Sequence, residues 1–275
     1  MTAERPMIFD LRAVQAARAR ARRIGGDRFL DQAALEGLCD RLSAVTRRFD
    51  HGLWIGETLP PAIRAFARDW SVVDFDEREV LNIDKAPFDL AVSLYSLQAI
   101  NDLPGALIQI RRVLKPDGLF LAALFGGETL RELRESFAVA ETEMSGGISP
   151  RVAPFADVRD MGALLQRAGF ALPVADVERL QVRYHDFGSL VRDLRAHAQG
   201  NVLAARRRRF LGRRVLNALV AYYSAHHAQD GKLSATFETL YLTGWAPHQS
   251  QQQPLKPGSA KSRLSDALGT VERKL

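Results

Sequence analysis

The feature that most constrains the fold is a run of strand and helix signals between residues 88 and 124. Two apolar runs, 88–94 and 118–124, have the composition of strands that are buried on both faces. Between them, Asp102 is placed to cap a helix with a three-four apolar repeat, and the turn at 115–118 separates that helix from the second strand. Such a unit forms a right-handed crossover between parallel strands. The sequence therefore predicts an α/β fold with a parallel sheet.

Further helices and strands are expected around this unit from apolar spacing and from turn residues. The expected helices cover residues 11–24, 30–49, 61–69, 128–143, 158–168 (capped by Gly169) and 203–225, and the expected strands cover 52–55, 71–75, 174–177, 179–184 and 239–245. We expect an N-terminal helical segment at 1–50, an α/β domain at 51–248 with a helical insertion at about 186–230, and a mobile tail at 249–275.

Composition excludes several classes of protein. Of the 275 residues, 47% are apolar, which is enough for a buried core. No run approaches the ~20 apolar residues that a membrane-spanning helix needs. The single Cys39 excludes an internal disulfide and a cysteine-ligated metal cluster, and it suits a reducing compartment. No metal site is expected, because the adjacent His226 and His227 point to different faces of a helix.

The N-terminal region bears on location. Residues 11–24 are rich in arginine, as mitochondrial transit peptides are, but Glu4 and Asp10 are acids of the kind that such peptides avoid. We therefore expect a bacterial cytoplasmic protein. Peripheral attachment to a membrane is an alternative, and the mitochondrial matrix is less favoured.

The densest charge feature is a run of four arginines, Arg206, Arg207, Arg208 and Arg209, in a chain with a formal net charge of +6. Because an apolar helical stripe follows them, we expect several of them to face outward. Such a patch can receive an acidic protein, a phosphate or an anionic membrane surface, and a solvated, ion-paired face remains the alternative. Specific nucleic-acid binding is not expected, because no aromatic residues are interleaved with the arginines.

Several sequence motifs, taken in order, resemble a known family. Segments 101–107, 114–118 and 125–134 are similar to class I S-adenosylmethionine-dependent methyltransferases. Segments 147–155, 164–170 and 244–251 are similar to a narrower branch, which contains the mitochondrial respiratory complex I assembly factor of methyltransferase fold and its alphaproteobacterial relatives, with malonyl-ACP O-methyltransferase as a cousin. The resemblance implies a Rossmann-like, mostly parallel sheet with helices on both faces and S-adenosylmethionine at the carboxyl ends of its strands.

The expected cofactor turn departs from the family pattern D-x-G-x-G-x-G. Only Gly56 is kept, whereas Trp54, Thr58 and Pro60 replace the acid and the other two glycines. Glu57 adds a negative charge where the cofactor's carboxylate would lie, and two like charges about 4 Å apart repel by about 1 kcal/mol in water. Two functions therefore stay open: an enzyme that uses S-adenosylmethionine, and a non-catalytic assembly or scaffold module.

The second strand raises a related question. Residues 55–88 are too few for the family's usual two intervening strand–helix units, so we expect one unit to be missing. Asp74 or Asp76 could hold the ribose hydroxyls if the strand at 71–75 pairs with 52–55. Alternatively, this acidic stretch corresponds to the family's third strand, and the ribose has no acid.

These arguments give two sets of candidate residues and no named catalytic residue. The cofactor-binding candidates are Gly56, Asp74, Asp76, Ser93, Leu94 and Gln98. The candidates for binding a partner or substrate are Phe125, Gly126, Gly127, the arginines Arg206–Arg209, Trp245 and His248. The resemblance implies a protein partner, and a respiratory-chain subunit is the specific candidate.

Overall fold

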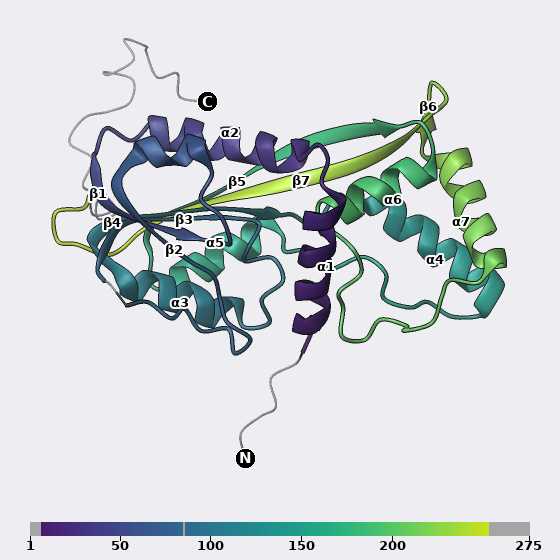
Figure 1. The fold of residues 1–275 in the computed structure, drawn as a ribbon, viewed down its shortest axis with the longest axis horizontal. Coiled ribbons are helices and arrows are strands. Elements are labelled where there is room, and N and C mark those ends of the chain that lie inside the picture. The colour runs from purple at the N-terminus through teal and green to yellow at the C-terminus, as the bar shows by residue number, and fades with distance from the viewer. Residues whose placement is uncertain (1–6, 85, 253–275) are drawn as a thin grey trace, which may run out of the picture.

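The computed structural model describes residues 7–84 and 86–252, which fold around one twisted sheet (Figure 1). Its strands follow the order β2-β1-β3-β4-β7-β5, and the short β6 pairs with β7. Strands β2, β1, β3 and β4 are parallel, whereas β7 runs antiparallel to β4 and to β5. The strands are β1 (Phe49–Ile55), β2 (Ala67–Val73), β3 (Phe88–Leu94), β4 (Leu114–Phe125), β5 (Ala171–Tyr184), β6 (Ala228–Gln229) and β7 (Lys232–Trp245).

The strand–helix–strand unit expected from the sequence is confirmed. It consists of β3, helix α3 (Leu103–Val113) and β4, and the Asp102 carboxylate caps α3 by accepting a hydrogen bond from the Gly105 amide at 3.0 Å. The turn expected at 115–118 appears as an irregularity in the ladder, because pairing with β3 moves from Leu114 directly to Leu119. The observed fold is the predicted α/β class.

Helices cover both faces of the sheet. On one face, α3 and α5 (Val158–Arg167) bury Leu107, Ile110 and Leu165 against the strands. On the other face, α2 (Phe29–Ser43) buries Leu38 and Leu42 against β1, β3 and β4. Two separate apolar layers therefore hold the sheet, as in doubly wound α/β proteins.

The distal halves of β5 and β7 extend past the parallel strands and carry a third apolar cluster (Figure 1). Its helices are α4 (Arg131–Ser145), α6 (Phe187–Ala196) and α7 (Arg213–His226). Tyr223 is fully buried there and donates a hydrogen bond to the Ser234 carbonyl at 2.7 Å. Helix α1 (Leu11–Ile24) crosses between this helical part and the parallel strands (Figure 1).

Some expected boundaries were wrong. Residues 61–69 were expected as one helix, but a 3₁₀ helix (Pro61–Phe66) gives way to β2 at Ala67, because pairing with β1 satisfies the backbone from that residue onward. The expected strands at 174–177 and 179–184 form the single strand β5. The helix expected at 203–225 begins only at Arg213, so Arg206–Arg209 lie outside any helix.

The expectation of a missing unit is confirmed within the part of the chain that the structure describes. Between β2 and β3, residues 74–84 and 86–87 contain neither a helix nor a strand of the sheet, only an isolated bridge between Phe75 and Leu81. Strand β2 is therefore the edge strand next to β1. None of the helices in the described ranges combines the length and apolar content needed to cross a bilayer. The tail expected at 249–275 lies outside the described residues from 253 onward.

Candidate functional site

A cavity of about 500 Å³ opens at the carboxyl ends of β1, β2 and β3. Helix α1, the start of α2 and the segments 151–155 and 197–202 close its other sides. Ligands of parallel α/β sheets bind at this edge, because the loops that follow the strands meet there. Of the six cofactor-binding candidates, the cavity is lined by Gly56, Asp74, Leu94 and Gln98.

The turn after β1 is closely packed at its one retained glycine. Gly56 has a φ of 154°, and a Cβ added there would lie 3.0 Å from both Trp54 Nε1 and Ser96 Oγ. The Trp54 indole is buried, and its Nε1 has no hydrogen-bond partner among the described residues. A glycine such as Gly56, next to a buried hydrogen-bond donor without a partner such as Trp54 Nε1, is typical of a place where a ligand approaches the backbone. These observations fit a small polar ligand in the cavity.

Asp74 lies immediately after the strand that pairs with β1, because β2 and β1 are neighbours in parallel register. The alternative in which this acidic stretch stands at the family's third strand was therefore wrong. The Asp74 Oδ1 atom accepts a hydrogen bond from the Phe75 amide at 2.9 Å, and Oδ2 accepts one from Arg18 at 2.7 Å. Asp74 thus presents an oriented carboxylate to the cavity, at the position the resemblance requires for a ribose-binding acid.

Two of the cofactor-binding candidates do not line the cavity. Asp76 organises the following turn instead, because its carboxylate accepts hydrogen bonds from the amides of Arg78 and Val80, both at 2.9 Å. These backbone hydrogen bonds lower the pKa of Asp76. Ser93 is fully buried within β3, and its hydroxyl has no partner among the described residues. Because Ser93 is packed inside the central strand β3, its side chain does not reach the cavity at the carboxyl ends of the strands.

Helix α1 changes the electrostatics expected at Glu57. Arg22 of α1 pairs with Glu57 at 2.5 Å, and Arg18, one turn earlier, pairs with Asp74 at 2.7 Å. From the sequence, Glu57 was expected to be an unpaired charge that would repel a ligand carboxylate. The guanidinium of Arg22 partly offsets that charge, which weakens the objection to an anionic ligand end.

The wall after β3 is held by contacts with β4 and β7. The side-chain Oε1 atom of Gln98 accepts a hydrogen bond from the Phe125 amide at 3.3 Å, which joins the ends of β3 and β4. Tyr95, which lines the cavity, stacks on Phe125 with ring centroids 4.2 Å apart, and its hydroxyl lies 2.9 Å from Thr239 Oγ1. Burial raises the pKa of Tyr95 well above its usual range, so the phenol stays neutral.

His197 is a cavity residue that sequence reasoning did not select. Its ring is 4% exposed, its Nδ1 lies 3.3 Å from Asp31 Oδ1, and its Nε2 has no partner among the described residues. Its spacing from other polar residues gave no signal in the sequence, because His197 and Asp31 are 166 residues apart and only the tertiary structure brings them together.

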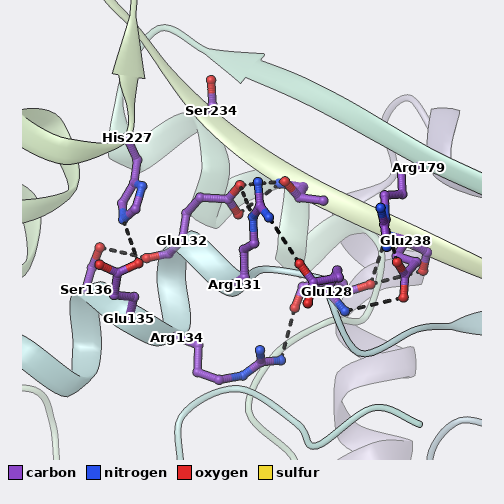
Figure 2. Close-up of polar contacts among 12 residues, drawn as sticks. Glu128, Arg131, Glu132, Arg134, Glu135, Ser136, Arg179, His227, Ser234 and Glu238 are labelled. Carbon is purple, nitrogen blue, oxygen red and sulfur yellow. Dashed lines mark hydrogen bonds and ion pairs between the residues drawn. The ribbon is translucent and has the colours of Figure 1, made fainter. Parts of the chain in front are cut away.

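The candidates Phe125 and Gly126 belong to the interior, whereas Gly127 is half-buried. Phe125 is 2% exposed, and a Cβ on Gly126 would lie 2.4 Å from Glu238 Oε1. Figure 2 shows the surrounding polar contacts, in which Glu238 accepts hydrogen bonds from Arg179 at 2.7 Å and from the Glu128 amide at 3.4 Å. This network fixes the turn between β4 and α4, so Phe125 and Gly126 support the cavity wall and are not open to a protein partner.

Trp245 and His248 lie at the other end of the sheet. Trp245 pairs with Leu119, near the start of β4, whereas the cavity lies beyond the carboxyl ends of the parallel strands. The His248 ring bonds Ser250 at 2.7 Å within a local turn. The antiparallel direction of β7 therefore separates Trp245 and His248 from the candidates at 125–127, so these two groups of candidates do not form one surface.

The arginine run lies in the connection between the Leu203 bridge and α7. Arg206 pairs with Asp10 at 3.0 Å, and Arg206 is the main cause of the lowered pKa of Asp10. By contrast, Arg207, Arg208 and Arg209 are exposed and line a second cavity of about 600 Å³ beside the fully exposed ring of Phe210. Three of the four arginines therefore face outward, although no helix presents them.

Residues 9–173 match the sequence model of a methyltransferase domain, which covers more than half of the chain. The chain belongs to the class I methyltransferase family. A solved structure, the YcgJ protein of Bacillus subtilis, covers 78% of this chain and 99% of its own at a TM-score of 0.50, and its 12% identity supports the fold alone.

The similar relatives carry two kinds of name. The human protein named mitochondrial arginine-hydroxylase NDUFAF5 is 42% identical over 71% of this chain and 56% of its own, and the Dictyostelium discoideum protein of the same name is 40% identical over 70% and 45%. A malonyl-[acyl-carrier protein] O-methyltransferase of Laribacter hongkongensis is 37% identical over 71% of this chain and 63% of its own. The chain thus spans about half the length of the arginine-hydroxylase relatives it matches.

Proposed function

We propose that this protein is an S-adenosylmethionine-binding enzyme that modifies a side chain of a protein partner, with arginine as the target residue. One observation carries the proposal: the cavity joins the glycine turn after β1 to an oriented carboxylate, Asp74, at the end of the adjacent strand. The matching methyltransferase domain supports the cofactor. The names of the arginine-hydroxylase relatives support arginine as the target.

The residues have separable roles in this proposal. Asp74 holds the ribose hydroxyls, Gly56 lets the backbone approach the ligand, and the Leu94–Gln98 wall supports the nucleoside. When bound, the cofactor supplies the reactive group, and the protein contributes binding, orientation and exclusion of water. The oriented carboxylate is the part of the site that needs no rearrangement before the ligand arrives.

Calorimetric titration tests the cofactor. S-adenosylhomocysteine should bind the unmodified protein with a dissociation constant in the micromolar range, which corresponds to about −8 kcal/mol. Asp74→Asn should weaken binding at least about tenfold, because a neutral amide accepts weaker hydrogen bonds from the ribose than a carboxylate does. The matched control is Asp69→Asn, which lies on the strand that precedes Asp74 but is exposed and outside the cavity. No heat up to millimolar ligand would contradict the proposal.

The partner surface in this proposal is formed by Arg207, Arg208, Arg209 and the exposed Phe210. Their charge favours an acidic protein surface, and the resemblance to the complex I assembly branch favours a respiratory-chain subunit. The triple variant Arg207→Gln/Arg208→Gln/Arg209→Gln should reduce binding to poly-glutamate and lower its salt dependence. The control Arg12→Gln/Arg20→Gln/Arg23→Gln removes three exposed arginines of α1. An equal loss in both variants would count against a specific surface.

A further inference from the structure

Helix α1 contributes charged side chains to the strand-end cavity. Arg18 and Arg22 lie four residues apart, so both project from one face of the helix, and both line the cavity. The neighbouring Arg20 and Arg23 are exposed and lie outside it. The arginine-rich N-terminal helix is therefore divided between a solvent face and a cavity face.

The two cavity arginines meet acids that follow neighbouring strands. Arg18 reaches Asp74 after β2, and Arg22 reaches Glu57 after β1. The Arg18–Asp74 pair is the more buried, with side chains 28% and 21% exposed, whereas Arg22 and Glu57 are 55% and 45% exposed. An exposed pair of this kind holds its partners weakly, so the Arg22 guanidinium can turn to a ligand at little cost.

The other cavity arginines outside α1 pair with acids that do not follow β1 or β2. Arg151 is 14% exposed and pairs at 2.5 Å with Glu141, a carboxylate that is 1% exposed, and releasing it would leave that charge buried. Arg28 bonds Asp31 at 2.7 Å, next to His197 at the start of α2. Among the described cavity residues, Arg22 therefore combines a free-to-move guanidinium with a position at the turn after β1.

We propose that Arg22 receives the carboxylate of the amino-acid end of an S-adenosyl ligand, with Arg18 as a positioning residue that orients Asp74. This inference rests on the proposed function and adds to it a binding residue that lies outside the β1 turn. A guanidinium matches a carboxylate with two parallel hydrogen bonds, which an isolated backbone amide cannot do. Helix α1 then supplies the positive charge for the ligand carboxylate, which the turn with Glu57, Thr58 and Pro60 does not supply.

Two ligands separate this role from general effects on the cavity. S-adenosylhomocysteine carries the amino-acid end, whereas 5′-methylthioadenosine is the same nucleoside thioether without it. Arg22→Gln should weaken binding of S-adenosylhomocysteine at least about tenfold and leave 5′-methylthioadenosine within about twofold. The control Arg23→Gln, one residue further along α1 and exposed, should change neither.

A second variant tests the role of the Arg22 charge by removing the acid that pairs with it. Glu57→Gln removes the competing acid, so it should tighten S-adenosylhomocysteine two- to tenfold without affecting 5′-methylthioadenosine. The inference is overturned if the unmodified protein binds both ligands and Arg22→Gln weakens neither, or weakens both equally. If the unmodified protein binds neither ligand, the proposed function itself fails. Circular dichroism of each variant verifies that it is folded.

Discussion

At the scale of single residues, Asp89 is the best example of a charge that the fold requires. It lies at the start of β3 with 6% exposure, where it accepts hydrogen bonds from the amides of Asp50 and His51 at 2.9 and 3.0 Å. It also pairs with Lys115 at 2.7 Å. Burial alone would raise the pKa of Asp89, but the contacts with Lys115 and the two amides outweigh burial and lower it. One carboxylate thus joins β1, β3 and β4.

This shift has a defined pH dependence. Because the folded-state pKa of Asp89 lies below its unfolded value, its contribution to stability is present above about pH 4 and is lost as pH falls through the folded-state pKa. Asp89→Asn should cost about 1–3 kcal/mol at neutral pH, and the difference from the unmodified protein should shrink toward pH 3. Urea unfolding from pH 7 to pH 3 measures this. A difference that grows as pH falls would contradict the assignment.

At the scale of elements, glycines in two helices show how tertiary contacts reverse a local preference. Gly37 of α2 packs on Tyr241 of β7, and a Cβ there would lie 2.2 Å from the Tyr241 hydroxyl. Arg41 covers the same ring, with its guanidinium carbon 3.5 Å from the ring centroid. Gly162 of α5 has nothing within 4 Å of the corresponding position. Helix propensity alone treats the two glycines alike.

The same substitution should therefore have opposite effects at these sites. Gly162→Ala should stabilise the protein by up to about 1 kcal/mol, because alanine restricts the unfolded chain and favours helix. Gly37→Ala should destabilise it by about 1–3 kcal/mol, because the tyrosine ring must move. Chemical denaturation of the two single variants measures both effects. Equal effects in both helices would mean that α2 does not pack on β7 as described.

Helix α1 as an element should respond to ligand. Because Arg18 and Arg22 contact acids that follow β2 and β1, a ligand that bridges these groups should stabilise α1 against local opening. Hydrogen exchange of α1 amides should slow when S-adenosylhomocysteine is added, whereas exchange in α7, which does not line this cavity, should not change. Slowing in α7 alone would place the ligand elsewhere.

At the scale of the whole molecule, ligand binding should raise thermal stability. A ligand at one hundred times its dissociation constant contributes about 2.7 kcal/mol when only the folded state binds it. For a chain of this size, that corresponds to a rise of roughly 5–10 °C in the melting temperature. Differential scanning fluorimetry with S-adenosylhomocysteine measures it, and Asp74→Asn, with an about tenfold weaker affinity, should show about half that rise or less at the same ligand concentration. An equal rise in both proteins would exclude Asp74 from the site.

Local sequence was sufficient wherever neighbouring residues decide the structure. The β3–α3–β4 unit, the Asp102 cap and the missing unit before β3 could all be predicted, and Gly169, with a φ of 85°, follows α5 as expected. Helix capping and apolar periodicity depend on residues close together in the chain, and the number of residues between two strands limits how many elements fit between them. All three can therefore be read from the sequence. Gly56 and the pair Asp74 and Asp76 could be selected only by combining the expected strand ends with the family resemblance.

Tertiary structure alone decided which strand ends meet and which charges face them. Pairing of β2 with β1 distinguished Asp74 from Asp76, and the antiparallel β7 moved Trp245 away from the cavity. The partners of Glu57 and Asp74 come from α1, 35 and 56 residues earlier in the chain. His197 also lies at the cavity, where it contacts Asp31, a residue that is 166 positions earlier in the chain. Charge pairing across such separations depends on packing of whole elements, which local propensity does not encode.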